Sequence, residues 1–154
     1  MIDKKLEPTI ACIVRHRNEL RRKASEFGRV VERLGEDRPC ETSLRALDHL
    51  VHEVGTDLLP RLERHVEEMT RLCESRLRAG RAEASDLAGA IDRLREQAEG
   101  LKGELALARY VAGPADAKMM WDLMAAGREL ENHIRSVARR EGELAERLGE
   151  PKVL

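Results

Sequence analysis

The chain has 154 residues and a formal net charge of −1 at pH 7, with 37% charged and 42% hydrophobic residues. This length suits one domain with its own core, residues 1–154, and the near-neutral charge gives no general attraction to nucleic acid or anionic lipid. Aromatic residues make up only 2%, too few for a platform on which bases stack. We therefore expect a single domain that binds neither nucleic acid nor a membrane.

The three cysteines, Cys12, Cys40 and Cys73, are widely spaced and form no CxxC pair. This spacing excludes a zinc ribbon or thioredoxin-type motif and favours reduced thiols in the cytoplasm. The first residues lack a long apolar run with a cleavage site, and no stretch approaches the roughly 18 apolar residues of a membrane span. The excess of Arg, Ala, Glu and Leu suggests a bacterial source.

The first predicted element is a helix over about residues 5–34. Pro8 falls in its first turn, where a missing amide proton costs little, and the break at 35–39 ends it. A second helix is expected over about 42–78, with Thr42 or Ser43 as its N-cap. Apolar residues in both recur at the three- and four-residue spacing of one helical face.

Pro60 interrupts the second helix and predicts a kink there, or a new start with Asp57 as N-cap. A third helix is predicted over about 86–111, capped by Ser85 or Asp86, and a fourth over about 116–148. Short connections make neighbouring helices antiparallel, and their apolar stripes bury against one another. We predict an all-α fold, an antiparallel up-and-down four-helix bundle.

Three histidines, His16, His65 and His133, lie on three different helices, within or beside the apolar stripe. In an antiparallel bundle, residues at equal distances along the chain before and after a loop lie at the same height. On this basis the three histidines lie within about one helical turn of one another. Other polar groups map to the same layer: Cys12, Glu68, Gln97 and Glu129. Imidazole, carboxylate and thiolate groups are ligands for iron or zinc, so a metal ion between the helices would explain the cluster. Alternatively, neighbouring carboxylates and carbonyls satisfy the histidines without a metal.

Parts of three helices carry a family resemblance. They are Ile10-Ala-Cys-Ile-Val-Arg-His16, Asp57-Leu-Leu-Pro60-Arg-Leu-Glu-Arg-His65 and Leu130-Glu-Asn-His133-Ile134. Together they resemble the hemerythrin-like (HHE cation-binding) domains, and the resemblance covers nearly the whole chain. It implies a four-helix bundle that holds iron and takes up O₂, NO or peroxide for sensing, storage or detoxification.

The sequence departs from the family pattern at several ligand positions. Arg61 stands where the family has histidine after Leu-Leu-Pro, and His65 stands where it has glutamate. Gln97 replaces the histidine of the third helix, and Val137 and Ala138 stand where acids are expected after His133. The resemblance therefore implies an altered iron site, mono- or dinuclear, or a bundle that has lost its metal.

Three interpretations remain open. In the first, the protein binds iron through His16, His65 and His133, with Glu129 and Glu68 supplying oxygen. In the second, it is a metal-free adaptor that binds a protein partner or a second copy through an apolar run at 119–124. In the third, Cys12 joins the histidines in a tetrahedral zinc or redox-responsive centre.

Other charged and polar groups favour no further site. No nucleophile–base constellation predicts an enzyme. His49 and His52 have the spacing of a surface metal clip but lack a third inward partner, so we expect a solvated face. A basic run at 15–23 could bind an acidic partner, and interspersed acids favour an ordinary charged surface instead.

Overall fold

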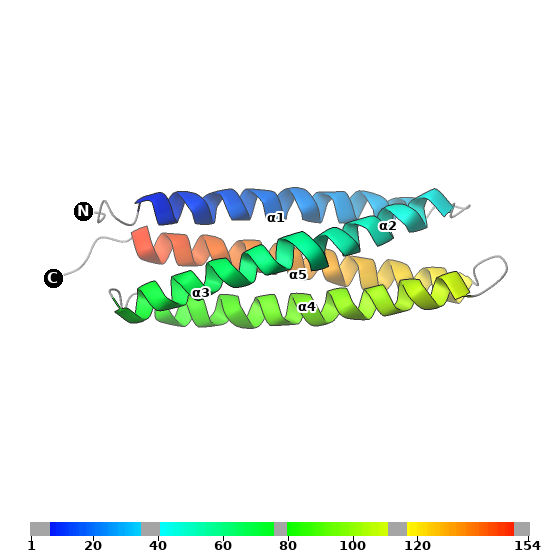
Figure 1. Cartoon of the computed structure of the whole chain (residues 1–154). Helices are drawn as coiled ribbons and strands as arrows, with labels where there is room; N and C mark the ends of the chain where they lie inside the picture. Colours follow the sequence, from blue (N-terminus) through cyan, green and yellow to red (C-terminus); the bar gives the residue numbers. More distant parts are fainter. Residues whose placement is uncertain (1–6, 35–40, 76–79, 111–116, 150–154) are drawn as a thin grey trace.

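The computed structural model describes residues 7–34, 41–75, 80–110 and 117–149, and every residue in these ranges except Gly80 is helical. The elements are α1 (Glu7–Leu34), α2 (Glu41–Glu53), the π-helical turn η1 (Val54–Leu58), α3 (Leu59–Ser75), α4 (Arg81–Tyr110) and α5 (Ala117–Gly149). Because α2, η1 and α3 follow one another without a break, the described chain makes four helical passes (Figure 1). The predicted all-α four-helix bundle is confirmed.

Successive passes run in opposite directions along the bundle (Figure 1). α5 packs against both α1 and α4, whereas α2 packs on α1 and α3 packs on α4. The second pass therefore crosses the bundle obliquely, and α3 diverges from α1 toward the end where α1 begins (Figure 1). Among the described helices, none combines the length and apolar character needed to cross a membrane.

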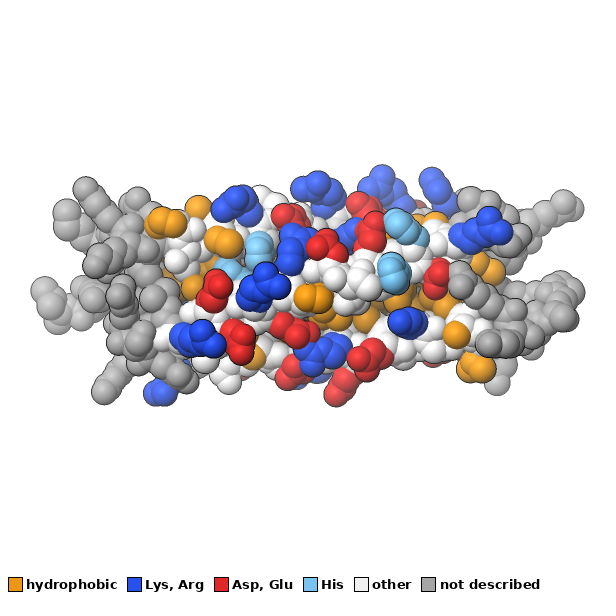
Figure 2. Space-filling view, viewed as in Figure 1, with side chains coloured by type: hydrophobic (Ala, Val, Ile, Leu, Met, Phe, Trp, Pro, Cys, Tyr) orange, Lys and Arg blue, Asp and Glu red, His pale blue; other side chains and the backbone are white. Residues whose placement is uncertain are grey.

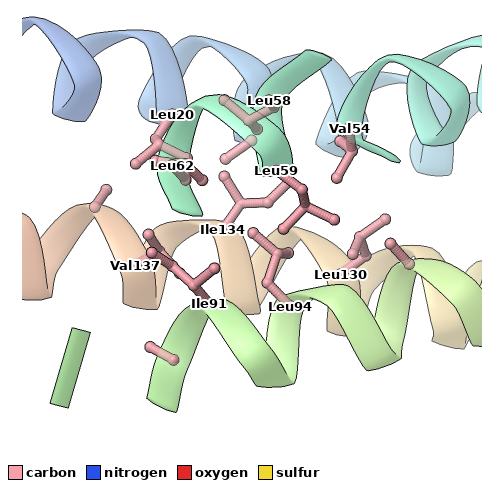
Figure 3. Close-up of a cluster of buried hydrophobic side chains, with 14 of the residues drawn as sticks. Leu20, Val54, Leu58, Leu59, Leu62, Ile91, Leu94, Leu130, Ile134 and Val137 are labelled. Atoms are coloured by element: carbon pink, nitrogen blue, oxygen red, sulfur yellow. The ribbon is translucent and has the colours of Figure 1, made fainter. Parts of the chain in front are cut away.

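The core consists of aliphatic side chains that all four passes contribute. Leu20 of α1, Leu62 of α3, Ile91 of α4 and Ile134 of α5 converge in its middle (Figure 3), and each of them is at most 2% exposed. Burying a side chain of this size stabilises the fold by about 1.5–3 kcal/mol. The stripes predicted from the three- and four-residue spacing therefore form the core.

The π-helical turn η1 lies directly before Pro60. The Leu59 N–H donates to the Val54 carbonyl five residues earlier, which widens the helix at this point. Pro60 has no N–H to donate, and its ring needs space in the preceding turn, so the wide turn accommodates it without ending the helix. Thr56 Oγ1 also donates to the His52 carbonyl at 2.8 Å. The prediction of a new start capped by Asp57 is thus wrong: the pass continues through one π-helical turn that contains Asp57.

The start of α4 also differs from the prediction. Gly80 has a φ of +86°, a conformation that glycine adopts easily, and its carbonyl accepts a hydrogen bond from the Ala84 N–H at 2.8 Å. The helix therefore begins at Arg81, and Ser85 and Asp86 lie inside it rather than capping it. The alanine-rich sequence that follows Gly80 favours this earlier start.

Candidate metal centre

Two candidate ligands lie on α1, one helical turn apart. Cys12 and His16 are four residues apart and so share one side of the helix, and both are half-buried. Cys12 Sγ lies 3.9 Å from His16 Nε2. The fully buried Ile13 and Leu20 fix this part of α1 in the core, which holds the pair at the edge of the apolar stripe.

The third candidate ligand comes from α3. His65 is only 6% exposed, and its Nδ1 lies 3.9 Å from Cys12 Sγ. The His16 and His65 ring centroids are 4.4 Å apart, with the planes inclined at 52°. One ligand atom from each of the three residues lies within 4.8 Å of the others. Cys12, His16 and His65, which we call the Cys-His cluster, thus meet where α1 and α3 diverge.

A buried carboxyl group on α5 stands beside this cluster. Glu141 is 0% exposed, and its Oε1 lies 4.0 Å from His16 Nδ1. Neither carboxyl oxygen has a hydrogen-bond partner among the described residues, and the same holds for His16 Nδ1 and His65 Nε2. Sequence reasoning missed Glu141, although its position was a usable signal: it lies four residues after Val137 and three before Leu144, within the apolar stripe.

Burial moves the pKa values of these groups toward their uncharged forms. Loss of hydration, with the His16 ring adding to it, lowers the pKa of His65 to about 4. The pKa of His16 is also lowered, again mainly by burial. Burial, followed by the nearby Glu19 charge, raises the pKa of Glu141 to about 8, against an opposing effect of Arg17. At neutral pH both imidazoles are therefore neutral and the Glu141 carboxyl is protonated, so their 4.0 Å approach is not an ion pair.

The donor set fits a divalent transition metal. A neutral imidazole offers a nitrogen lone pair, and a cysteine binds metal as the thiolate. In tetrahedral zinc sites, bonds of about 2.0–2.3 Å place neighbouring ligand atoms roughly 3.3–3.6 Å apart. The 3.9 Å distances from Cys12 Sγ to His16 Nε2 and His65 Nδ1 are only slightly longer. The two imidazole nitrogens lie within 4.8 Å of each other, so the rings would also have to rotate toward each other for all three atoms to reach one ion.

Glu141 would orient a ligand once its carboxyl has lost its proton and closed the 4.0 Å gap to His16 Nδ1. It approaches Nδ1 of His16, whereas Cys12 Sγ approaches Nε2 on the other side of the same ring. Metal-bound histidines commonly donate their second ring N–H to a carboxylate, which fixes the orientation of the ring. The Cys-His cluster therefore offers three candidate ligand atoms.

The other predicted ligands do not join this cluster. Glu68 is exposed on α3, and its charge acts on His65 only by raising the pKa against the dominant lowering by burial. Glu129 is exposed and accepts a hydrogen bond from Gln97 Nε2 at 3.0 Å. His133 is half-buried and lies eight residues before Glu141 on α5, a rise of about 12 Å. The structure thus brings together Cys12, His16 and His65 and separates them from His133, Glu129 and Glu68.

The two remaining histidines lie on the surface of α2. His49 Nε2 is 2.8 Å from Glu53 Oε1, and both His49 and His52 are exposed. Figure 2 shows histidine side chains in two groups, one toward each end of the bundle, and acidic and basic side chains lie around both. This agrees with the solvated face expected for His49 and His52.

The sequence matches no protein-family model, no curated protein and no solved structure.

Proposed function

We propose that this protein binds a divalent transition metal, with Zn²⁺ as the preferred ion. The ligands are Cys12 Sγ, His16 Nε2 and His65 Nδ1. The observation that carries this proposal is the convergence of one sulfur and two imidazole nitrogens within 4.8 Å of one another. The neutral state of both rings at pH 7 supports it, because their lone pairs are available. With three protein ligands, Zn²⁺ keeps a fourth position for water or a small exogenous ligand.

A sulfur ligand favours a zinc site over an iron site that binds O₂, NO or peroxide. Thiolate is a soft ligand, whereas the iron site that the hemerythrin-like resemblance implies would draw on carboxylates. The carboxylates and histidine expected for such a site, Glu68, Glu129 and His133, lie outside the Cys-His cluster. We therefore place zinc first and propose a hemerythrin-like ancestry in which the iron ligands have been replaced. A cytoplasmic location would keep the Cys12 thiol reduced.

The test uses protein purified without a histidine tag and stripped of metal by chelator. We expect one equivalent of Zn²⁺ to bind, and Co²⁺ in its place to give a thiolate-to-metal charge-transfer absorption band. Cys12→Ser should abolish that band, since it removes the only sulfur in the cluster. Cys73→Ala is the matched control: Cys73 is a buried cysteine outside the cluster, and its replacement should leave the band intact.

The metal-free adaptor gives the opposite result. If neither ion binds at one equivalent, or if the Co²⁺ spectrum is the same with and without Cys12, the proposed site is disproved. An iron site predicts Fe²⁺ binding that depends on His133 and Glu129 rather than on Cys12. The variants His133→Gln and Cys12→Ser, compared side by side, separate these two outcomes.

A further inference from the structure

A groove between α1 and α5 gathers four arginines. Arg17 and Arg21 line it from α1, and Arg135 and Arg139 line it from α5. Each pair is spaced by four residues and so projects from one face of its helix. The groove has a volume of about 380 Å³, near the lower end of the range of small-molecule sites.

The two α1 arginines belong to the basic groups of the described chain that form no ion pair. Neither the Arg17 nor the Arg21 guanidinium has a hydrogen bond or ion pair with a described side chain. By contrast, Arg61 pairs with Glu19 at 2.8 Å and with Asp57 at 3.0 Å. The Arg17 charge does act on the buried Glu141 carboxyl, but no hydrogen bond within the described residues occupies either guanidinium, so both can bind an anion from solution.

Arg17 is also partly enclosed. Its Nε is buried without a hydrogen-bond partner among the described residues. Its guanidinium lies over the α5 backbone at Gly142, where an added Cβ would stand 3.1 Å from Arg17 Nη1. A buried donor without an acceptor costs free energy, and an anion in the groove would supply acceptors to this guanidinium.

The α5 side of the groove carries compensating acids. Arg135 donates two hydrogen bonds to Glu131, at 3.2 and 2.9 Å. Arg139 Nε lies 4.0 Å from Glu143 Oε1, and Glu146 also lines the groove. Four arginines against these three glutamates leave one excess positive charge, and the two arginines without an ion pair are Arg17 and Arg21.

The basic run of residues 15–23 is therefore divided between two surfaces. Arg22 and Lys23 lie in another pocket, lined also by Glu19, Glu26 and Glu53, and Lys23 forms ion pairs with Glu26 and Glu53. Only Arg17 and Arg21 of this run line the α5 groove. The run that the sequence suggested is not one patch for an acidic protein, because acids of the same chain neutralise part of it.

We propose that the groove binds the phosphoryl group of a small anionic molecule. The planar guanidinium fork matches two phosphate oxygens, and two forks one helical turn apart can hold one phosphoryl group between them. The small volume and the glutamates lining the groove favour a compact ligand over an extended acidic peptide. None of the groove residues belongs to the Cys-His cluster, although Arg17 directly follows His16 and its charge acts on Glu141.

The test is calorimetric titration of the metal-free protein with inorganic phosphate, pyrophosphate and glycerol 3-phosphate at constant ionic strength. Metal-free protein is used because pyrophosphate itself chelates metal ions. We expect Arg17→Gln and Arg21→Gln each to weaken binding about tenfold, as the loss of a charge-assisted hydrogen bond predicts. The control Arg29→Gln removes an exposed arginine of the same helix that does not line the groove, and binding should stay within about twofold of the parent.

A second kind of variant should strengthen anion binding rather than weaken it. Glu146→Gln removes an exposed acid from the lining and should tighten binding, because it removes repulsion of the anion. The three phosphate compounds distinguish a free ion from a phosphate ester as the ligand. The proposal is overturned if none of them binds at millimolar concentration, or if Arg29→Gln weakens binding as much as Arg17→Gln does. Binding of a glutamate-rich peptide in place of all three compounds would equally overturn it.

Discussion

Glu141 is an ionisable residue in an environment that disfavours its charged form. It is fully buried, and neither carboxyl oxygen has a hydrogen-bond partner among the described residues. A carboxyl group in such a place keeps its proton, and its pKa is accordingly raised to about 8. A residue that opposes folding in this way is typical of a functional site, where the ligand supplies the missing interaction.

This conflict predicts that Glu141→Gln stabilises the metal-free protein, increasingly as the pH rises from 6.5 to 8. In the unfolded chain the carboxyl loses its proton near pH 4.5, but in the folded chain it does so only near pH 8. The unfolded state therefore binds fewer protons in this interval, and the stability of the parent protein falls as the pH rises. Glutamine carries no ionisable proton, so the difference at pH 8 should be on the order of a few kcal/mol. Urea unfolding at several pH values measures it.

The interval above pH 6.5 isolates Glu141 from His65. The pKa of His65 is lowered from 6.5 to about 4, so its contribution to stability is complete above pH 6.5 and is lost as the pH falls toward 4. Between pH 4.5 and 6.5 the two effects oppose each other. Glu143→Gln, which changes an exposed glutamate on the same helix, serves as the control. A pH-independent difference between Glu141→Gln and the parent would contradict the raised pKa.

At the scale of the elements, the contact between α1 and α5 depends on small residues. Gly127 is buried on α5, and a Cβ added there would lie 2.7 Å from Cγ2 of Val31 on α1. Val31 is 1% exposed and has a stiff, β-branched side chain, so it cannot move aside easily. The absence of a side chain at position 127 therefore sets how closely these two helices approach.

We expect Gly127→Ala to destabilise the protein by about 1–3 kcal/mol, although alanine is the better helix former. Gly103→Ala is the matched control, because a Cβ at this exposed α4 position meets no atom within 4 Å. That variant should gain about 0.5–1 kcal/mol from helix propensity alone. Unfolding midpoints of the two variants measure the difference. Equal gains in both would show that α1 and α5 are not in close contact at Gly127.

Two features of the helices could not be predicted from the sequence pattern. Pro60 predicts an interruption of the regular α-helix, but the pattern cannot choose between an Asp57 cap and the π-helical turn at Val54–Leu58. That choice depends on whether the wider turn still packs, and Leu58 and Leu59 on either side of the junction are both buried. Similarly, Ser85 and Asp86 are good capping residues, but Gly80 allows the helix to begin earlier.

At the scale of the whole molecule, zinc is expected to raise the melting temperature. An ion that binds only the folded state stabilises it by about 2.7 kcal/mol when its free concentration is 100 times Kd. For a domain of this size that corresponds to a rise of roughly 5–10 °C. Thermal unfolding with zinc, and with zinc plus chelator, measures the shift.

Two variants and one other cation make this prediction specific. His65→Gln should remove the shift, because it removes one ligand, whereas His52→Gln alters an exposed histidine and should keep it whole. Mg²⁺ prefers oxygen ligands and should have no effect. A shift that persists in His65→Gln would place the ion elsewhere.

The four-helix architecture followed from the spacing of apolar residues, since that spacing alone decides which faces must be buried. The candidate metal site could be predicted from the sequence only in part. Cys12 and His16 share one helical face, so the sequence predicts that they are neighbours, and both lie beside His65 in the structure. His133 and Glu129 would fall in the same layer only if all four helices were straight and parallel. The oblique course of the second pass breaks that assumption (Figure 1).

The divergence of α1 from α3 has a consequence for how the molecule opens. Cys12 and His65 are 53 positions apart in the sequence, and they meet where their helices make little backbone contact. In the metal-free protein, the beginning of α1 can therefore separate from α3 by local unfolding, without disruption of the packing between α4 and α5. An ion bound by the proposed ligands would connect the first pass to the second. We therefore expect this end of the metal-bound protein to unfold only together with the rest of the bundle.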